Sequence, residues 1–143
     1  MPTFTDVGHV IQLAIAPVFM LTAIGTVLNV LVARLGRAVD RRRILAAALP
    51  KLDGEVAVEA RLEIDFEVRR IRIIFYAMTA SVVSALLVCV LISLAFIDAF
   101  VKFDLAKVVA ALFILAMLAL LAALVLFLRE ILLSVNSPRA PVL

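Results

Sequence analysis

The sequence has 143 residues, of which 66% are hydrophobic, with a formal net charge of +3 and a mean hydropathy of +1.24. Soluble globular domains are about 45–50% apolar, so this chain carries more hydrocarbon than one small core could hide. A single histidine and a single cysteine exclude an intrachain disulfide and argue against a zinc site. Since no catalytic set of side chains is recognisable either, we expect no cofactor and no enzymatic activity.

Three uninterrupted apolar runs account for the excess hydrocarbon, at about 10–33, 73–97 and 108–128. Each is longer than the roughly 20 residues that a helix needs to cross the hydrocarbon core of a bilayer. They predict an all-α integral membrane protein with three transmembrane helices. We expect the first run to be an uncleaved span, because no basic region precedes it as in a signal peptide.

The distribution of lysine and arginine predicts the orientation of these spans. The segment 34–72 holds ten of them, whereas the loop between the second and third runs holds only Lys102 and Lys107. Positive residues stay on the cytoplasmic side. The N-terminus is therefore expected outside, with the 34–72 segment and the C-terminus in the cytoplasm, and the net charge reflects topology rather than a nucleic-acid partner.

The segment 34–72 is predicted to be an antiparallel helical hairpin. The first helix meets no strong stop before Pro50, and Gly54 follows shortly after. Between Val56 and Val68 apolar and charged residues alternate, which favours a strand, but no second strand pattern offers a partner. We therefore predict a helix from about Glu55 into the second span. The chain is expected to form one membrane domain, 1–143, with a tail, 129–143, that is disordered at its end.

A stripe of polar side chains in the first span is the main candidate for function. Its members are Gln12, Thr22, Thr26 and Asn29. The last three follow helical i, i+4, i+7 spacing, and Gln12 joins Thr26 by heptad steps. Because polar groups are costly in lipid, the stripe should be shielded. In one interpretation it hydrogen-bonds neighbouring helices. In the other, copies of this helix surround a wet pore and the stripe lines the axis.

Three further features carry candidate roles. A basic group just inside the membrane is expected either to bind anionic lipid headgroups or to line a vestibule in an oligomer. Its residues are Arg34, Arg37, Arg41, Arg42 and Arg43. Small residues in the second span, at spacing that allows close helix packing, are Ala77, Ser81, Ser84 and Ala85. Pro17 predicts a kink in the first helix.

Four pieces of the sequence carry a family resemblance. They are VIQLAIAPVF at 10–19, LTAIG at 21–25, the NVL…RLGRAVDRRR block ending at Arg43, and LFLREI at 126–131. Together they resemble a bacterial family of small three-span membrane proteins catalogued only as a domain of unknown function. The resemblance implies a location in the bacterial inner membrane and supplies no activity.

The layout alone, with a cytoplasmic loop and helices running beyond the bilayer, resembles the proton-channel subunits of the Ton, Tol and flagellar motor systems. Those subunits form homo-oligomeric rings, whereas this chain is shorter and has its polar stripe in the first span. We therefore expect a homo-oligomeric, channel-like protein, or alternatively a non-conducting scaffold or accessory subunit that binds a partner through its hairpin.

Overall fold

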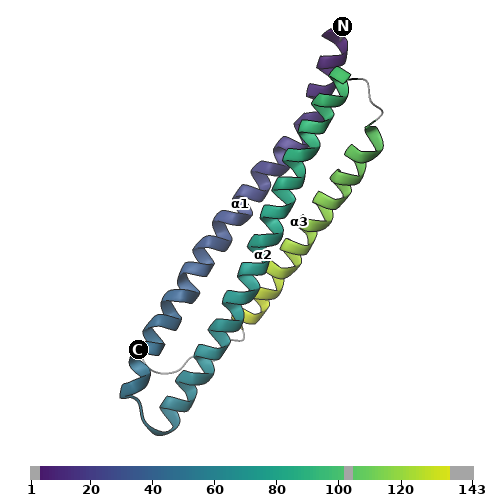
Figure 1. Cartoon of the computed structure of the whole chain (residues 1–143). Helices are drawn as coiled ribbons and strands as arrows, with labels where there is room; N and C mark the ends of the chain where they lie inside the picture. The colour runs from purple at the N-terminus through teal and green to yellow at the C-terminus, as the bar shows by residue number, and fades with distance from the viewer. Residues whose placement is uncertain (1–3, 102–104, 136–143) are drawn as a thin grey trace. The chain divides into compact units, whose positions relative to one another are not determined.

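The computed structural model describes residues 4–101 and 105–135, and the regular secondary structure of this part of the chain is helical throughout. In chain order they are α1 (Phe4–Ala48), the short 3-10 helix η1 (Leu49–Lys51), α2 (Gly54–Val101) and α3 (Ala106–Val135), as Figure 1 shows. The all-helical prediction is confirmed for this part of the chain, including the alternating segment, which lies within α2. The predicted disorder of the tail end concerns residues 136–143, outside the described part.

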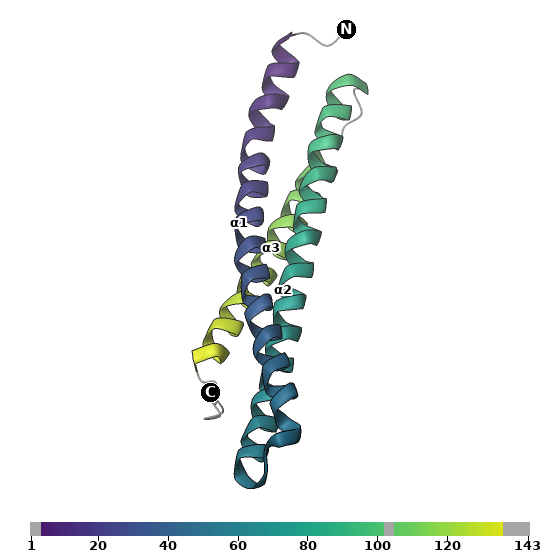
Figure 2. The same cartoon turned by 90° about the vertical axis from the view of Figure 1, so that its left-hand side faces the viewer.

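The turn between α1 and α2 follows from its local sequence (Figures 1 and 2). Pro50 cannot continue the α-helical hydrogen bonding of α1, and η1 forms around it. The Leu52 N–H donates to the Leu49 carbonyl at 3.2 Å, and Leu52 itself is extended. Gly54 then has φ +64, a left-handed conformation that glycine adopts without steric cost.

The helices divide into two compact units, each of which contains part of all three helices. The first unit comprises residues 1–28 and 79–122, and the second comprises residues 29–78 and 123–143. The apolar run of every predicted span contributes residues to the first unit. The charged segment 34–72 lies wholly in the second.

The first unit has a small apolar core formed by α2 and α3, against which Met20 and Leu21 of α1 also pack. Val88, Leu91 and Ala116 are buried at its centre. The Ser84 hydroxyl is also buried and donates to the Ala116 carbonyl at 2.7 Å. A small side chain at Ala116 leaves room for this contact, which is how helices without a hydrophobic drive between them associate in lipid.

In the second unit the buried residues follow heptad spacing along each helix. Leu31, Ala38 and Leu45 recur every seven residues in α1, and Ala123 and Glu130 do so in α3. In α2 the buried positions are Ala60, Glu63, Glu67, Ile74 and Ala77. Steps of three, four and seven are typical of left-handed coiled-coil packing. Three of these buried positions carry carboxylates, which an apolar seam would not predict.

Candidate functional site: a buried ionic network

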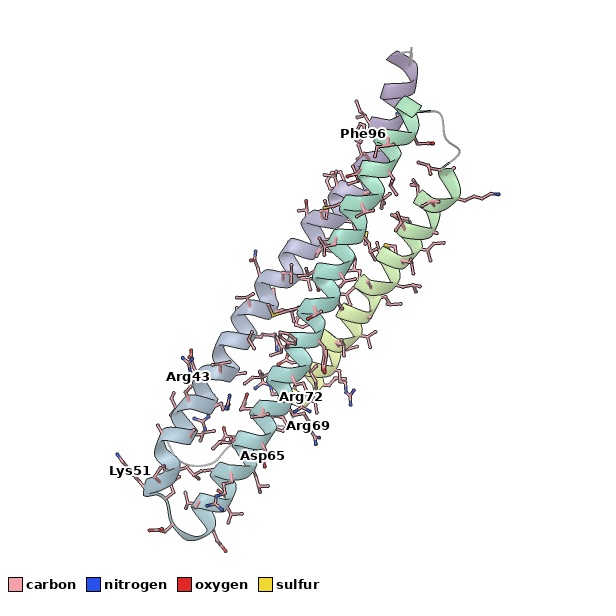
Figure 3. All side chains as sticks on the ribbon, in the orientation of Figure 1. Arg43, Lys51, Asp65, Arg69, Arg72 and Phe96 are labelled. Atoms are coloured by element: carbon pink, nitrogen blue, oxygen red, sulfur yellow. The ribbon has the colours of Figure 1, made fainter. Side chains whose placement is uncertain are left out.

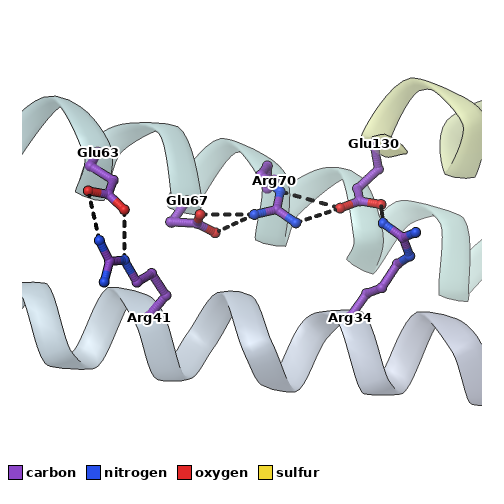
Figure 4. A network of polar contacts seen from close by, with 6 residues as sticks. All are labelled: Arg34, Arg41, Glu63, Glu67, Arg70 and Glu130. Carbon is purple, nitrogen blue, oxygen red and sulfur yellow. Dashed lines mark hydrogen bonds and ion pairs between the residues drawn. The ribbon is translucent and has the colours of Figure 1, made fainter. Parts of the chain in front are cut away.

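Six charged side chains of the second unit form ion pairs and hydrogen bonds in two groups, a linked set of four residues and a separate pair, drawn in Figure 4 and here together named the network. The network takes two residues from α1, three from α2 and one from α3. Its three arginines and three glutamates cancel in formal charge. The members are Arg34, Arg41, Glu63, Glu67, Arg70 and Glu130.

Glu130 of α3 is the centre of the network, and its side chain is completely buried. Arg34 of α1 donates from Nη1 to Oε2 at 2.9 Å. Arg70 of α2 donates from Nη2 and Nε to Oε1, at 2.8 and 3.3 Å. One carboxylate therefore ties all three helices together, with each of its oxygens assigned to a different helix.

Arg34 has a second contact in this region. Its guanidinium carbon lies 5.3 Å from the centroid of the Phe127 ring, one turn before Glu130 on α3. Stacking over an aromatic face is favourable for a guanidinium that is partly withdrawn from water. The Arg34 Nε is buried and has no hydrogen-bond partner in the described structure. The hydrogen bond to Glu130 and the stacking on Phe127 are therefore the contacts that hold this guanidinium in place.

Arg70 extends the network along α2 to Glu67, one turn earlier. Its Nη1 donates to both carboxylate oxygens of Glu67, at 2.9 and 3.1 Å. Burial raises the pKa of Glu67, and the neighbouring Arg70 opposes that rise. Both residues precede the apolar stretch that begins at Ile73. Arg70 thus neutralises two carboxylates at once, and Glu67 is the less well compensated of the two because Glu130 also has Arg34.

Arg41 and Glu63 form a separate bidentate pair further along the hairpin. Arg41 donates from Nε to Oε1 at 2.7 Å and from Nη2 to Oε2 at 3.2 Å. The hydrogen bond to Glu63 is the largest factor that raises the pKa of Arg41. This fork-shaped geometry is the strongest that arginine and a carboxylate adopt. It holds α1 against α2 between the turn and the Glu130 centre.

The polar stripe lies on the surface of the single chain. Gln12, Thr22, Thr26 and Asn29 are all exposed. Both threonine hydroxyls donate to the carbonyl one turn earlier in α1, Thr22 to Val18 at 3.5 Å and Thr26 to Thr22 at 3.1 Å. Within the described structure, the amides of Gln12 and Asn29 have no such partner. The chain by itself therefore does not shield the stripe.

The predicted basic group separates into two kinds of residue. Arg34 and Arg41 belong to the network, whereas Arg37, Arg42 and Arg43 are exposed. Figure 3 labels Arg43 on α1. The five arginines therefore do not act as one cationic face, because two of them are neutralised within the chain.

The remaining predicted residues lie as follows. Ala77, Ser81 and Ser84 are completely buried, and Ala85 is partly exposed. Pro17 is buried inside α1, which continues through it as one helix, and the kink stays a prediction.

The sequence analysis missed four of the six network residues, namely Glu63, Glu67, Arg70 and Glu130. Two signals could have identified them. Glu63, Glu67 and Arg70 follow i, i+4, i+7 spacing, the same helical face rule that picked out the stripe. Glu130 is the one acidic residue after Asp104, and it lies within the LFLREI segment that carries the family resemblance.

Three of the described helices are long and apolar enough to cross a membrane. Their outward surfaces carry many exposed large apolar side chains, among them Phe19, Phe75 and Leu86. A water-soluble protein rarely exposes contiguous apolar surface on this scale. The fold therefore defines a multi-pass α-helical membrane protein.

The chain belongs to the family described as "Protein of unknown function (DUF2721)", which it matches over residues 14–140. This confirms the resemblance inferred from the sequence motifs. The match takes in all six network residues and every stripe residue except Gln12. No curated protein matches the chain, and no solved structure does.

Proposed function

We propose that this protein is a subunit of a homo-oligomeric, channel-like assembly in the bacterial inner membrane, in which the polar stripe of α1 faces the assembly axis. The N-terminus lies outside and the hairpin in the cytoplasm, in keeping with the excess of lysine and arginine in segment 34–72. The proposal gives the chain no catalytic role. The observation that carries it is the exposure of the stripe on the isolated chain.

The two amides of the stripe favour an assembly of several chains. Gln12 and Asn29 are exposed on a helix whose surrounding surface is apolar. An amide moved from water into hydrocarbon without a hydrogen-bond partner costs several kcal/mol. A second chain or enclosed water would remove that cost. Since the described part of one chain offers neither amide a partner, further copies of the chain are the simplest source.

The threonines favour a wet axis over a dry helix interface. Thr22 and Thr26 already donate their hydroxyl protons within α1, so each hydroxyl oxygen still has acceptor capacity. Acceptor oxygens and amides in a ring suit partly hydrated cations. The pairing of Arg34 and Arg41 within the chain also reduces the positive field that a vestibule of five arginines would place beside such an axis.

A second candidate function is that of a non-conducting scaffold or accessory subunit. The observation that favours it is the ionic network, which joins α1, α2 and α3 at Glu130 and ties α1 to α2 again nearer the turn through Arg41 and Glu63. A hairpin held in this way presents a fixed surface on which a protein partner could dock. In that case the stripe only contributes hydrogen bonds between copies or to the partner.

Two measurements test these functions on the detergent-purified full chain. Native mass spectrometry gives the copy number, and a strict monomer would reject the channel. Ion flux into proteoliposomes is then compared for the wild type, Asn29→Leu and the control Ser93→Leu, which replaces an exposed polar residue of α2 instead. We expect Asn29→Leu to reduce flux at least tenfold and the control to leave it unchanged.

The results separate the two candidates. If Asn29→Leu leaves the flux of an oligomer untouched, the stripe does not line the pathway. If the wild type assembles without conducting and Asn29→Leu weakens that assembly, the scaffold function is favoured.

A further inference from the structure

We propose that four exposed arginines at the Glu130 level of the second unit form a binding surface for the headgroups of anionic membrane lipids. They are named here the boundary arginines: Arg37, Arg69, Arg72 and Arg129. The surface exists on a single chain, so this inference is independent of the proposed channel and of any oligomer.

The Glu130 contacts define the level. Because Arg34, Arg70 and Glu130 are joined by hydrogen bonds of 2.8–3.3 Å, these points on α1, α2 and α3 lie side by side. Each boundary arginine is within three residues of one of them, which is at most about 4.5 Å along a helix axis. The four side chains therefore start from nearly the same height on three different helices.

At this level the acidic side chains are buried, whereas four basic side chains are exposed. Within three residues of the network centre, the carboxylates are Glu67 and Glu130, and both are buried. Together they neutralise Arg34 and Arg70. The charged side chains left exposed within this window are the four boundary arginines, and the exposed acids Asp40 and Asp65 lie about one turn nearer the hairpin turn. Figure 3 labels two of them, Arg69 and Arg72, on α2.

The position of the boundary arginines along the chain identifies the occupant as lipid. Arg72 immediately precedes the apolar run 73–97, Arg129 immediately follows the run 108–128, and Arg37 comes four residues after the run 10–33. All three apolar runs thus end beside this cationic level. That is where lipid phosphates lie when the runs cross a bilayer, and a guanidinium binds a phosphate through two parallel hydrogen bonds.

Exposed charges further along the hairpin lack this arrangement. Lys51 and Arg61 are accompanied by the exposed acids Asp53, Glu55 and Glu59. There the two signs are mixed, and no apolar run adjoins. They therefore provide control positions of the same charge that lie away from the boundary level.

The test measures binding of phosphatidylglycerol to the full chain in nonionic micelles, by native mass spectrometry across a lipid titration. The first variant changes the four boundary arginines to glutamine. The matched control changes Arg42, Arg43, Lys51 and Arg61 to glutamine, which removes the same charge from positions at least five residues nearer the turn than any boundary arginine. It also tests the alternative from the sequence, in which Arg42 and Arg43 bind the headgroups. One arginine near a membrane surface contributes about fivefold in affinity. We expect the first variant to bind several hundredfold more weakly, about fivefold for each of four arginines, and the control less than tenfold.

Further arms make the inference falsifiable. Phosphatidylcholine should bind the wild type weakly, and inorganic phosphate at equal concentration should not displace phosphatidylglycerol. If the fourfold variant fails to fold, the single variants should each weaken binding about fivefold. The inference is overturned if both fourfold variants lose the same affinity, if phosphatidylcholine binds equally well, or if inorganic phosphate competes and so identifies a soluble-anion site.

Discussion

Replacing Glu130 by glutamine tests whether the ionic network holds the second unit together. The substitution preserves the size of a completely buried side chain but removes its charge. It breaks ion pairs with Arg34 and Arg70, whose side chains are 25% and 13% exposed. Removing one partner of a buried pair typically costs 3–5 kcal/mol. Arg34 is partly exposed, and Arg70 keeps Glu67 as a partner, so neither arginine would be left fully buried and unpaired. The expected loss in free energy of unfolding is therefore at the lower end, about 3 kcal/mol.

For a chain of this size, 1 kcal/mol corresponds to about 2–4 °C in Tm, so Glu130→Gln should lower the Tm by about 6–12 °C. The assay heats the detergent-purified chain and measures the fraction that stays in the monodisperse peak on size exclusion, together with the helical circular dichroism signal. Glu59→Gln, an exposed acid on α2, is the control and should shift the Tm by no more than about 2 °C.

A double-mutant cycle separates the ion pair from a general packing defect. If Arg34 and Glu130 stabilise each other, Arg34→Gln should cost less in the Glu130→Gln background than in the wild type, by about 1–2 kcal/mol. Strictly additive shifts in Tm would contradict the pairing. A Glu130→Gln protein as stable as the Glu59→Gln control would refute the whole argument, because the buried carboxylate would then contribute nothing.

Four further substitutions use the same thermal assay. Glu67→Gln should leave the Tm at neutral pH unchanged or raise it slightly. Burial raises the pKa of Glu67, so folding favours the protonated carboxyl and its ionisation lowers stability as the pH rises. A large fall in Tm would contradict this. Ser84→Ala should lower the Tm by about 1–4 °C through loss of one interhelical hydrogen bond. Ala116→Leu should lower the Tm by more, because Ala116 is completely buried and the larger side chain would overpack the site. Gly54→Ala should lower the free energy of unfolding by about 1 kcal/mol. The loss comes from the positive φ of residue 54 alone, because a Cβ at this position meets no atom within 4 Å. An unchanged Tm would show that this turn adjusts.

The helices themselves could be predicted because their signal is local. Apolar runs longer than a bilayer is thick leave little choice of structure, and Pro50 and Gly54 mark the turn. The helix through the alternating segment was also predicted. Its packing was not, because Val56 and Val58 are exposed whereas Glu63 and Glu67 are buried. Hydropathy assigns glutamate to the surface and does not register the arginine partners, Arg41 of α1 for Glu63 and Arg70 of the same helix for Glu67.

The interhelical pairs centred on Glu130 could not be predicted because they join distant parts of the sequence. Arg34 and Glu130 are 96 positions apart, and Arg70 and Glu130 are 60 apart. From the sequence, Arg34 and Arg41 share one face with Arg37, and nothing local separates the paired arginines from the exposed one. The stripe presents the opposite difficulty: its residues are easily found, but what shields Asn29 depends on other molecules.

The positions of these charges suggest why a membrane protein keeps them buried. The buried positions of α2 in the second unit include Ala60 and Ala77, and small side chains permit one helix to slide past another. A slip by one turn would separate Arg41 from Glu63 and Glu130 from its two arginines. Each unpaired buried carboxylate would cost several kcal/mol. We infer that the network selects one register among packings that the small residues alone would leave close in free energy, as a buried polar residue does in a coiled coil. The boundary arginines depend on that register, since they share a level only while Glu130 holds the three helices together.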